Sequence, residues 1–232
     1  MTRDLNHRRF IPALRFDRLT PLYDPLVRLT LRESTFKHKL VEQARIETAH
    51  RVLDLACGTG TLSLMIKQAH PQTAVVGIDA DANILRIAQT KASQAGLEVE
   101  FRTGMASELP YPDGSFDRVV SSLFFHHLRR EGKLGALKES FRILRPGGEM
   151  HLADWGRPSN ALLRAAFVSV QLLDGFETTG DNLRSLLPGF LTQAGFTDVQ
   201  ATARFATLFG SLHLYCARKP DVPRPGPSTY RA

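Results

Sequence analysis

A chain of 232 residues, with 43% hydrophobic and 23% charged side chains, is long enough to bury one full core and too short for several large domains. Its two cysteines, Cys57 and Cys216, lie far apart without a CxxC spacing, which excludes a disulfide framework and a cysteine-based zinc site. The formal net charge is +7, but the basic residues are spread along the chain, which favours a solvated basic surface over a nucleic-acid partner.

No apolar run is longer than a strand, so we expect no stable insertion into a membrane. Residues 1–10 are basic but lack the apolar stretch of a secretory signal, and the protein is therefore expected to be cytoplasmic. The eight histidines show no HxxxH or HExxH spacing, so the sequence predicts no metal site.

Strand-like and helix-like patterns alternate from about residue 51 to residue 155. Asp81 is placed as the N-cap of a helix over residues 82–95, and Gly96 as its C-terminal stop. Strand, helix and strand joined by short connections predict a parallel, doubly wound sheet. The predicted strands are 52–56, 75–78, 99–102, 118–122 and 149–153, the last after a turn at Pro146–Gly148, and the other predicted helices are 62–69 and 133–144.

The segments outside this alternation complete the predicted organisation. Residues 1–48 are expected to form an N-terminal helical arm or lid, ahead of a main domain over residues 49–219. A lid insertion at about 157–195 reads as two helices broken around Gly175–Gly180. The remaining segments are residues 199–207 and 212–217, which predict a terminal antiparallel strand pair and a sheet of seven strands, and residues 220–232, a flexible proline-rich tail.

A glycine turn follows the first predicted strand. Gly58 and Gly60 form a Gly-x-Gly sequence there, which lets backbone approach a ligand closely. Asp79 comes 21 residues after Gly58, at the end of the second strand, where a carboxylate can bind both hydroxyls of a ribose. The pattern suits a nicotinamide dinucleotide or S-adenosylmethionine. Ser63 departs from the dinucleotide fingerprint, and Asp54 would repel a pyrophosphate but suits ammonium and sulfonium charges, so the second ligand is favoured.

Four motifs carry a family resemblance: Leu53–Gly60, Gly77–Asp79, Glu108–Asp117 and Leu144–Gly148. Their order and spacing resemble the class I S-adenosylmethionine-dependent methyltransferases, in the branch of the ubiquinone/menaquinone C-methyltransferases. The resemblance implies a Rossmann-like fold, with a helical lid, that binds S-adenosyl-L-methionine. It also implies methyl transfer to a small-molecule acceptor, which leaves S-adenosyl-L-homocysteine.

The resemblance assigns cofactor contacts residue by residue. Asp54, Ala56, Gly58 and Gly60 would hold the methionine part, and Asp79 the ribose. Around them, Ala80, Ile84, Gly104, Met105 and Ala106 would surround the adenine, Ser121 and Ser122 would face the methyl-donating end, and Tyr23 would reach over the cofactor from an N-terminal helix. Met105 stands where the family has an aspartate that accepts from the adenine amino group, and its thioether can only pack against the ring.

The acceptor side is predicted from residues that follow the fourth and fifth strands. A base is needed only if the acceptor loses a proton, and His126 and His127 titrate in a useful range. Asp154 lies at the same edge of the predicted sheet. Each of these residues has a structural alternative, as a capping or packing histidine or a buried aspartate. Residues 173–182, with two glycines and three acidic groups, are predicted to cover the substrate.

Three other functions remain open from the sequence. A methyltransferase-like binding module without catalysis agrees with Met105 in place of aspartate. A nicotinamide-dependent oxidoreductase is disfavoured by Asp54, Ser63 and the later motifs. Nucleic-acid methylation would suit a pI of about 9.8, but the chain lacks the Asn/Asp-Pro-Pro-Tyr/Phe motif of amino-methylating enzymes. The sequence leaves open whether the protein is a monomer or a homodimer.

Overall fold

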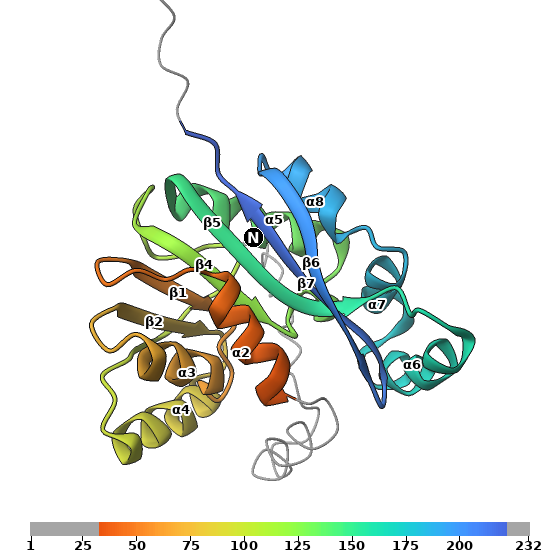
Figure 1. The fold of residues 1–232 in the computed structure, drawn as a ribbon, viewed down its shortest axis with the longest axis horizontal. Helices are drawn as coiled ribbons and strands as arrows, with labels where there is room; N and C mark the ends of the chain where they lie inside the picture. The colour runs from red at the N-terminus through yellow and green to blue at the C-terminus, as the bar shows by residue number, and fades with distance from the viewer. Residues whose placement is uncertain (1–32, 222–232) are drawn as a thin grey trace, which may run out of the picture.

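A computed structural model describes residues 33–221 (Figure 1). The predicted contact from Tyr23, most of the N-terminal arm and the end of the proline-rich tail lie outside these residues. The helices are α2 (Glu33–Gln43), α3 (Thr61–Ala69), α4 (Ala82–Ala95), α5 (Arg130–Ile143), α6 (Ala161–Asp174), α7 (Phe176–Leu183) and α8 (Leu187–Gln193), with a short 3-10 helix, η2 (Phe125–His127). The strands are β1 (Arg51–Leu55), β2 (Ala74–Asp79), β3 (Glu100–Thr103), β4 (Phe116–Ser122), β5 (Leu144–Gly156), β6 (Thr197–Thr207) and β7 (Gly210–Arg218).

The strands form one seven-stranded sheet in the order β3-β2-β1-β4-β5-β7-β6. The first five are parallel, and β7 runs antiparallel to both β5 and β6. The α/β fold and the terminal antiparallel pair predicted from the sequence are confirmed. The strand order reverses direction between β1 and β4, and ligands of open α/β sheets bind beside the carboxyl ends at such a point.

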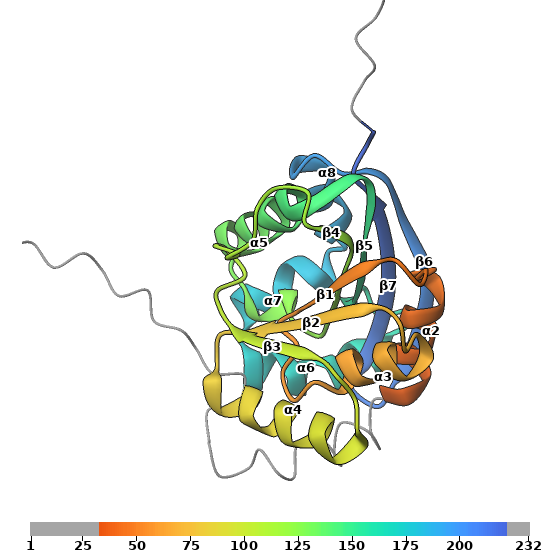
Figure 2. The same ribbon diagram turned by 90° about the vertical axis from the view of Figure 1, so that its left-hand side faces the viewer.

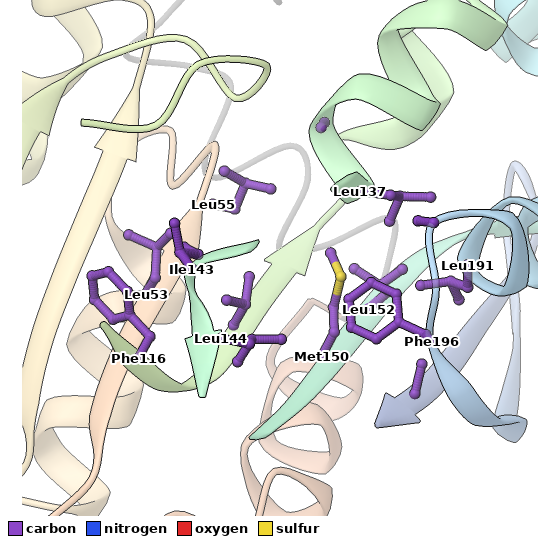
Figure 3. Packing of buried hydrophobic residues seen from close by; sticks show 14 of the residues in the cluster. Leu53, Leu55, Phe116, Leu137, Ile143, Leu144, Met150, Leu152, Leu191 and Phe196 are labelled. Carbon is purple, nitrogen blue, oxygen red and sulfur yellow. The ribbon is translucent and has the colours of Figure 1, made fainter. Parts of the chain in front are cut away.

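Alternate residues of the central strands supply two hydrophobic cores. In β4, Val119 packs on one face and Val120 on the other, and Leu152 and Ala153 divide in the same way in β5. Such continuous apolar runs are expected for parallel strands that are buried on both faces. Figure 3 shows the core on the side of α5 and α8, where Leu137 and Leu191 lie close to Met150 and Leu152.

The opposite core brings α2 into the domain. Phe36 and Leu40 of α2 are fully buried and pack with Val52 of β1 and Ile66 of α3. Figure 2 shows α2 and α3 on one face of the sheet and α5 on the other. Helix α2 lies within the predicted arm of residues 1–48, and its apolar side chains cover the sheet directly.

The capping signals of α4 act as predicted. Asp81 adopts an extended backbone conformation, and its carboxylate accepts a hydrogen bond of 2.8 Å from the backbone N–H of Asn83. Gly96 ends the helix with a φ of 65°, in the left-handed region that glycine tolerates. The bounds of this helix, residues 82–95, are therefore those that the sequence predicted.

Two predicted breaks differ in part from the structure. The turn at Pro146–Gly148 lies inside a single strand, β5, because Gly147 and Gly148 exchange backbone hydrogen bonds with Lys219. Gly175, with a φ of 96°, separates α6 from α7 as predicted. The rest of the predicted break, up to Gly180, belongs to α7, so the insertion holds three helices. Among residues 33–221, no helix combines the length and the apolar character needed to cross a bilayer.

Candidate functional site

The predicted site residues meet at the carboxyl edge of the sheet. The turn of Gly58 and Gly60 follows β1, and Asp79 ends the neighbouring strand β2. On the other side of β1, Ser122 ends β4 and Asp154 lies near the end of β5. Because these four strands are adjacent and parallel, residues from four separate parts of the chain lie along one edge.

The backbone at this edge departs from ordinary strand geometry. Ala56 and Leu123, which follow β1 and β4, both have a φ of 56°. Side chains other than glycine adopt this region at a cost of about 1–3 kcal/mol, and such residues gather at functional sites. Neighbouring strands hold these conformations, because Cys57 N–H donates to the Ile78 carbonyl at 3.0 Å and Leu123 N–H to the Ala153 carbonyl at 2.8 Å.

The two glycines of the turn serve different purposes. Gly58 has a φ of 54°, and a Cβ added there would have no atom of residues 33–221 within 4 Å, so this position faces open space. A Cβ at Gly60 would lie 2.8 Å from the Cβ of Ala88 and 3.0 Å from the ring of Phe101. Gly58 therefore leaves room for a ligand, whereas Gly60 lets α4 and β3 pack against the turn.

Asp54 lies behind the turn, where the sequence predicted it. Its side chain is 1% exposed and accepts a hydrogen bond of 2.6 Å from the Ser63 hydroxyl. Burial raises the pKa of Asp54 to about 6, against the opposing effects of Ser63 and of the Lys37 charge. Ser63 and Asp54 are the two residues that depart from the dinucleotide fingerprint. In the structure they are hydrogen-bonded to each other.

Asp79 connects β2 to the glycine turn. One carboxylate oxygen accepts from Gly58 N–H at 2.9 Å, and the other accepts from Asp81 N–H at 3.0 Å. Burial raises the pKa of Asp79, although these backbone N–H groups oppose the shift. A carboxylate offers about four lone-pair sites, so Asp79 has the capacity to accept from ligand hydroxyls in addition to these backbone N–H groups.

The residues predicted around the adenine follow the ends of β2 and β3. Ala80 and Ile84 are half-buried beyond the end of β2, and Gly104 N–H donates to the Asp79 carbonyl at 2.9 Å. Met105 is 47% exposed, and Ala106 packs against the core beside α5. Packing of the Met105 thioether against an adenine ring stays a prediction.

Ser121 and Ser122 differ in their surroundings. Ser121 is buried, and its hydroxyl donates to the Leu55 carbonyl at 2.8 Å, so this side chain joins β4 to β1. Ser122 is half-buried at the end of the strand. Of the two residues, Ser122 is the more exposed at the predicted methyl-donating end.

His126 is held from behind by Asp154. The Nδ1 of the ring lies 2.7 Å from the Asp154 carboxylate, which also accepts from the backbone N–H groups of His126 at 3.2 Å and Trp155 at 2.7 Å. Burial by itself would lower the pKa of His126, but Asp154 and Asp174 together raise it to about 9. The adjacent ring of His127 has its pKa lowered, by burial and by the charge of His126.

Asp174, at the end of α6, is the site residue that the sequence did not single out. Its carboxylate oxygens lie 3.5 Å from His126 Nε2 and 3.6 Å from His127 Nδ1. The predicted cover contained three acidic groups without distinguishing them. Of the other two, Glu177 lies at the surface 3.4 Å from Arg129, and Asp181 accepts from Arg130 at both oxygens, at 2.8 Å from Nη2 to Oδ1 and 3.2 Å from Nε to Oδ2.

The family model that matches this sequence and three of its relatives are all described as methyltransferases. A family model described as "Methyltransferase domain" matches residues 52–148. A demethylmenaquinone methyltransferase of Thermus thermophilus is 39% identical over 62% of this chain and 65% of its own length, and one of Deinococcus radiodurans is 34% identical over 66% and 63%. The chain thus spans less than two thirds of these two relatives. An uncharacterized methyltransferase of Synechocystis is 32% identical over 72% of this chain and 76% of its own length.

Solved structures share the fold. A SAM-dependent methyltransferase from Methanosarcina mazei superposes with a TM-score of 0.63 at 23% identity, over 78% of this chain and 98% of that one. A putative O-methyltransferase from Nostoc punctiforme gives a TM-score of 0.69 at 19% identity, over 87% of this chain and 59% of that one. At these identities the likeness concerns the fold.

Proposed function

Because the chain belongs to the class I S-adenosylmethionine-dependent methyltransferases, we infer that it transfers the sulfonium methyl group of S-adenosyl-L-methionine to a small-molecule acceptor. The observation that carries the proposal is the hydrogen bond of 2.9 Å between Gly58 N–H and Asp79. It joins the turn that faces open space to the carboxylate suited to a ribose. We propose that these two features together form the cofactor site.

The cofactor residues have separate parts in this proposal. The open side of Gly58 would receive the methionine part, and the buried charge of Asp54 would attract the ammonium and sulfonium groups. Asp79 would accept from the ribose hydroxyls, with Ala80, Ile84 and Met105 beside the adenine. When bound, the cofactor supplies the activated methyl group, and the protein contributes mainly alignment.

On the acceptor side, His126 and His127 follow β4, next to the strand that carries the glycine turn. The His127 side chain is 28% exposed and that of His126 only 4% exposed, so His127 is the more accessible of the two. We place His127 nearest the acceptor, with the His126–Asp154 pair behind it. In this proposal, the histidine side chains contact the acceptor.

A quinone-like acceptor is the first candidate, since two of the relatives are named demethylmenaquinone methyltransferases. The exposed side chains of Leu172, Leu173 and Phe176, at the end of α6 and the start of α7, support an apolar acceptor. Such side chains could exclude water from the reacting atoms if this part of the insertion contacts the acceptor. A dinucleotide-dependent oxidoreductase is disfavoured, because the buried carboxylate of Asp54 would lie close to a pyrophosphate.

Calorimetry tests the cofactor first. We expect S-adenosyl-L-homocysteine to bind the full chain with one site, and NADH to give no heat. Transfer of radiolabel from S-adenosyl-L-methionine to a demethylated naphthoquinone or to a metabolite extract then tests catalysis. Binding of NADH without binding of the homocysteine product would overturn the proposal. Product binding without any methylated molecule would favour the binding-module alternative.

A further inference from the structure

Three potential metal ligands converge beside the predicted methyl-transfer position. They are Nε2 of His126, Nδ1 of His127 and the carboxylate of Asp174, and their ligand atoms all lie within 4.8 Å of one another. The histidines belong to η2, whereas Asp174 comes from the far end of α6. Asp174 is far from the two histidines in the sequence. Their proximity therefore depends on how α6 packs over the carboxyl edge of the sheet.

Two distances within the cluster are close to those of ligands around an ion, and they involve different oxygens of Asp174, Oδ2 towards His126 Nε2 and Oδ1 towards His127 Nδ1. The separations of 3.5 Å and 3.6 Å between Asp174 and the two rings exceed the 2.7–3.2 Å of ordinary N–H···O hydrogen bonds. Ligands with metal bonds of about 2.0–2.1 Å in a tetrahedral site are about 3.3–3.4 Å apart. All three ligand atoms lie within 4.8 Å of one another, so an ion bound by all of them would draw the three side chains closer together.

The orientation of His126 supports the same conclusion. Its Nδ1 faces the Asp154 carboxylate at 2.7 Å, and that carboxylate is fixed by two backbone N–H groups. With Nδ1–H donated to Asp154, a neutral ring presents the lone pair of Nε2 to Asp174 and His127. Carboxylate, histidine and metal in this order are the usual arrangement behind a histidine ligand. An ion would take the place of the second ring proton.

Charge and access both suit a cation. Asp154 and Asp174 contribute two carboxylates, and the nearby Lys133 ammonium donates to the Leu128 and Thr178 carbonyls. The side chains of His127 and Asp174 are 28% and 20% exposed. The side of the cluster away from Asp154 is therefore accessible to water or to a second molecule.

We propose that His126, His127 and Asp174 bind one divalent transition-metal ion, with Asp154 as the residue that orients His126. Two imidazoles and one carboxylate suit ions such as Zn²⁺, Co²⁺, Ni²⁺ or Fe²⁺ better than Mg²⁺ or Ca²⁺. The ion joins the end of α6 to η2, which follows β4, and offers open coordination positions. A role for these positions in holding an acceptor oxygen or nitrogen rests on the proposed methyltransferase function, whereas ion binding itself does not.

A second cluster shows what such a site requires. Glu149, His151 and Cys216 also place ligand atoms within 4.8 Å of one another. However, Glu149 already lies 3.3 Å from the Arg45 guanidinium and 3.6 Å from that of Arg118. Two guanidinium groups at one carboxylate oppose the binding of a cation, and we do not extend the proposal to this cluster.

Titration of the untagged, chelator-treated full chain with Co²⁺ and with Zn²⁺ tests the proposal. We expect one equivalent to bind, and visible absorption bands from bound Co²⁺. Asp174→Asn and His127→Ala should each weaken binding tenfold or more. Glu177→Gln is the matched control, because Glu177 lies in the neighbouring α7 but faces Arg129, and its ion affinity should equal that of the wild type.

The outcomes separate this proposal from the proposed function. Absence of binding at millimolar Co²⁺ and Zn²⁺, or equal affinity in the wild type and in both ligand variants, would overturn the metal site. Circular dichroism and thermal melting of each variant show whether lost binding reflects lost folding, and Asp174→Asn keeps the shape of the side chain. Calorimetry with S-adenosyl-L-homocysteine on the same samples reports the cofactor site independently.

Discussion

Asp54→Asn measures how much the buried carboxylate lowers the free energy of unfolding of the protein without cofactor. Asp54 is 1% exposed at the end of β1, and its hydrogen-bond donor is the Ser63 hydroxyl at 2.6 Å. Burial raises the pKa of Asp54 from 3.8 to about 6, more than Ser63 and Lys37 lower it. At neutral pH the protein therefore holds an ionised group that folding has partly removed from water.

The pKa shift sets the size and the sign of the effect. A rise of about two pH units corresponds to about 3 kcal/mol, at about 1.4 kcal/mol per unit. Because the folded pKa lies above the unfolded one, protonation of Asp54 favours the folded state. This stabilisation of about 3 kcal/mol is fully present below about pH 4 and is lost as the pH rises through about 6. Asparagine carries no charge, so Asp54→Asn should raise the free energy of unfolding by about 1–3 kcal/mol at pH 8, with less gain at pH 5.

Urea unfolding of the unliganded wild type and variant at pH 5 and pH 8 measures this difference. The control is Asp113→Asn, at a carboxylate that is 80% exposed, and it should show no gain that grows with pH. Calorimetry should show that Asp54→Asn weakens S-adenosyl-L-homocysteine binding about tenfold, because an attractive charge is lost. A variant less stable than the wild type at pH 8, or a stability difference that is the same at both pH values, would refute the reasoning.

Four further substitutions test the cofactor turn and the packing of α2. Asp79→Ala should weaken binding of S-adenosyl-L-methionine by about 1.5–3 kcal/mol, because charge-assisted hydrogen bonds are lost, and an unchanged dissociation constant in a folded variant would place the ribose elsewhere. Gly60→Val should lower the melting temperature, because its Cβ would lie 2.8 Å from Ala88, whereas Gly58→Ala should remain folded and lose cofactor binding; equal melting temperatures would contradict this. Phe36→Ala should cost about 3–5 kcal/mol of unfolding free energy in urea, and a loss below about 1 kcal/mol would mean that α2 is dispensable for the core.

Local sequence signals determined the elements of the sheet and the outline of the cofactor turn. Helix α4 begins after Asp81 and ends before Gly96, as predicted. A carboxylate cap and a left-handed glycine hydrogen-bond only to nearby backbone groups, so the local sequence is enough to place them. The alternation of apolar strands with helices likewise determined a parallel sheet, since short connections leave few other topologies. Gly58 and Asp79 were recognised because their spacing follows from one strand, one turn and one helix.

Tertiary structure alone decided which residues meet. Pro146–Gly148 has the composition of a turn but continues β5, since Lys219 from the end of the chain pairs with it. Gly60 has the appearance of a ligand-facing glycine, yet its Cβ position is limited by Ala88 of α4. Asp174 was one of three acidic groups in a predicted cover, and only the packing of α6 brings it to His126 and His127. Periodicity and caps report on neighbours within about one turn of helix, whereas a contact between distant segments depends on how whole elements cross the sheet.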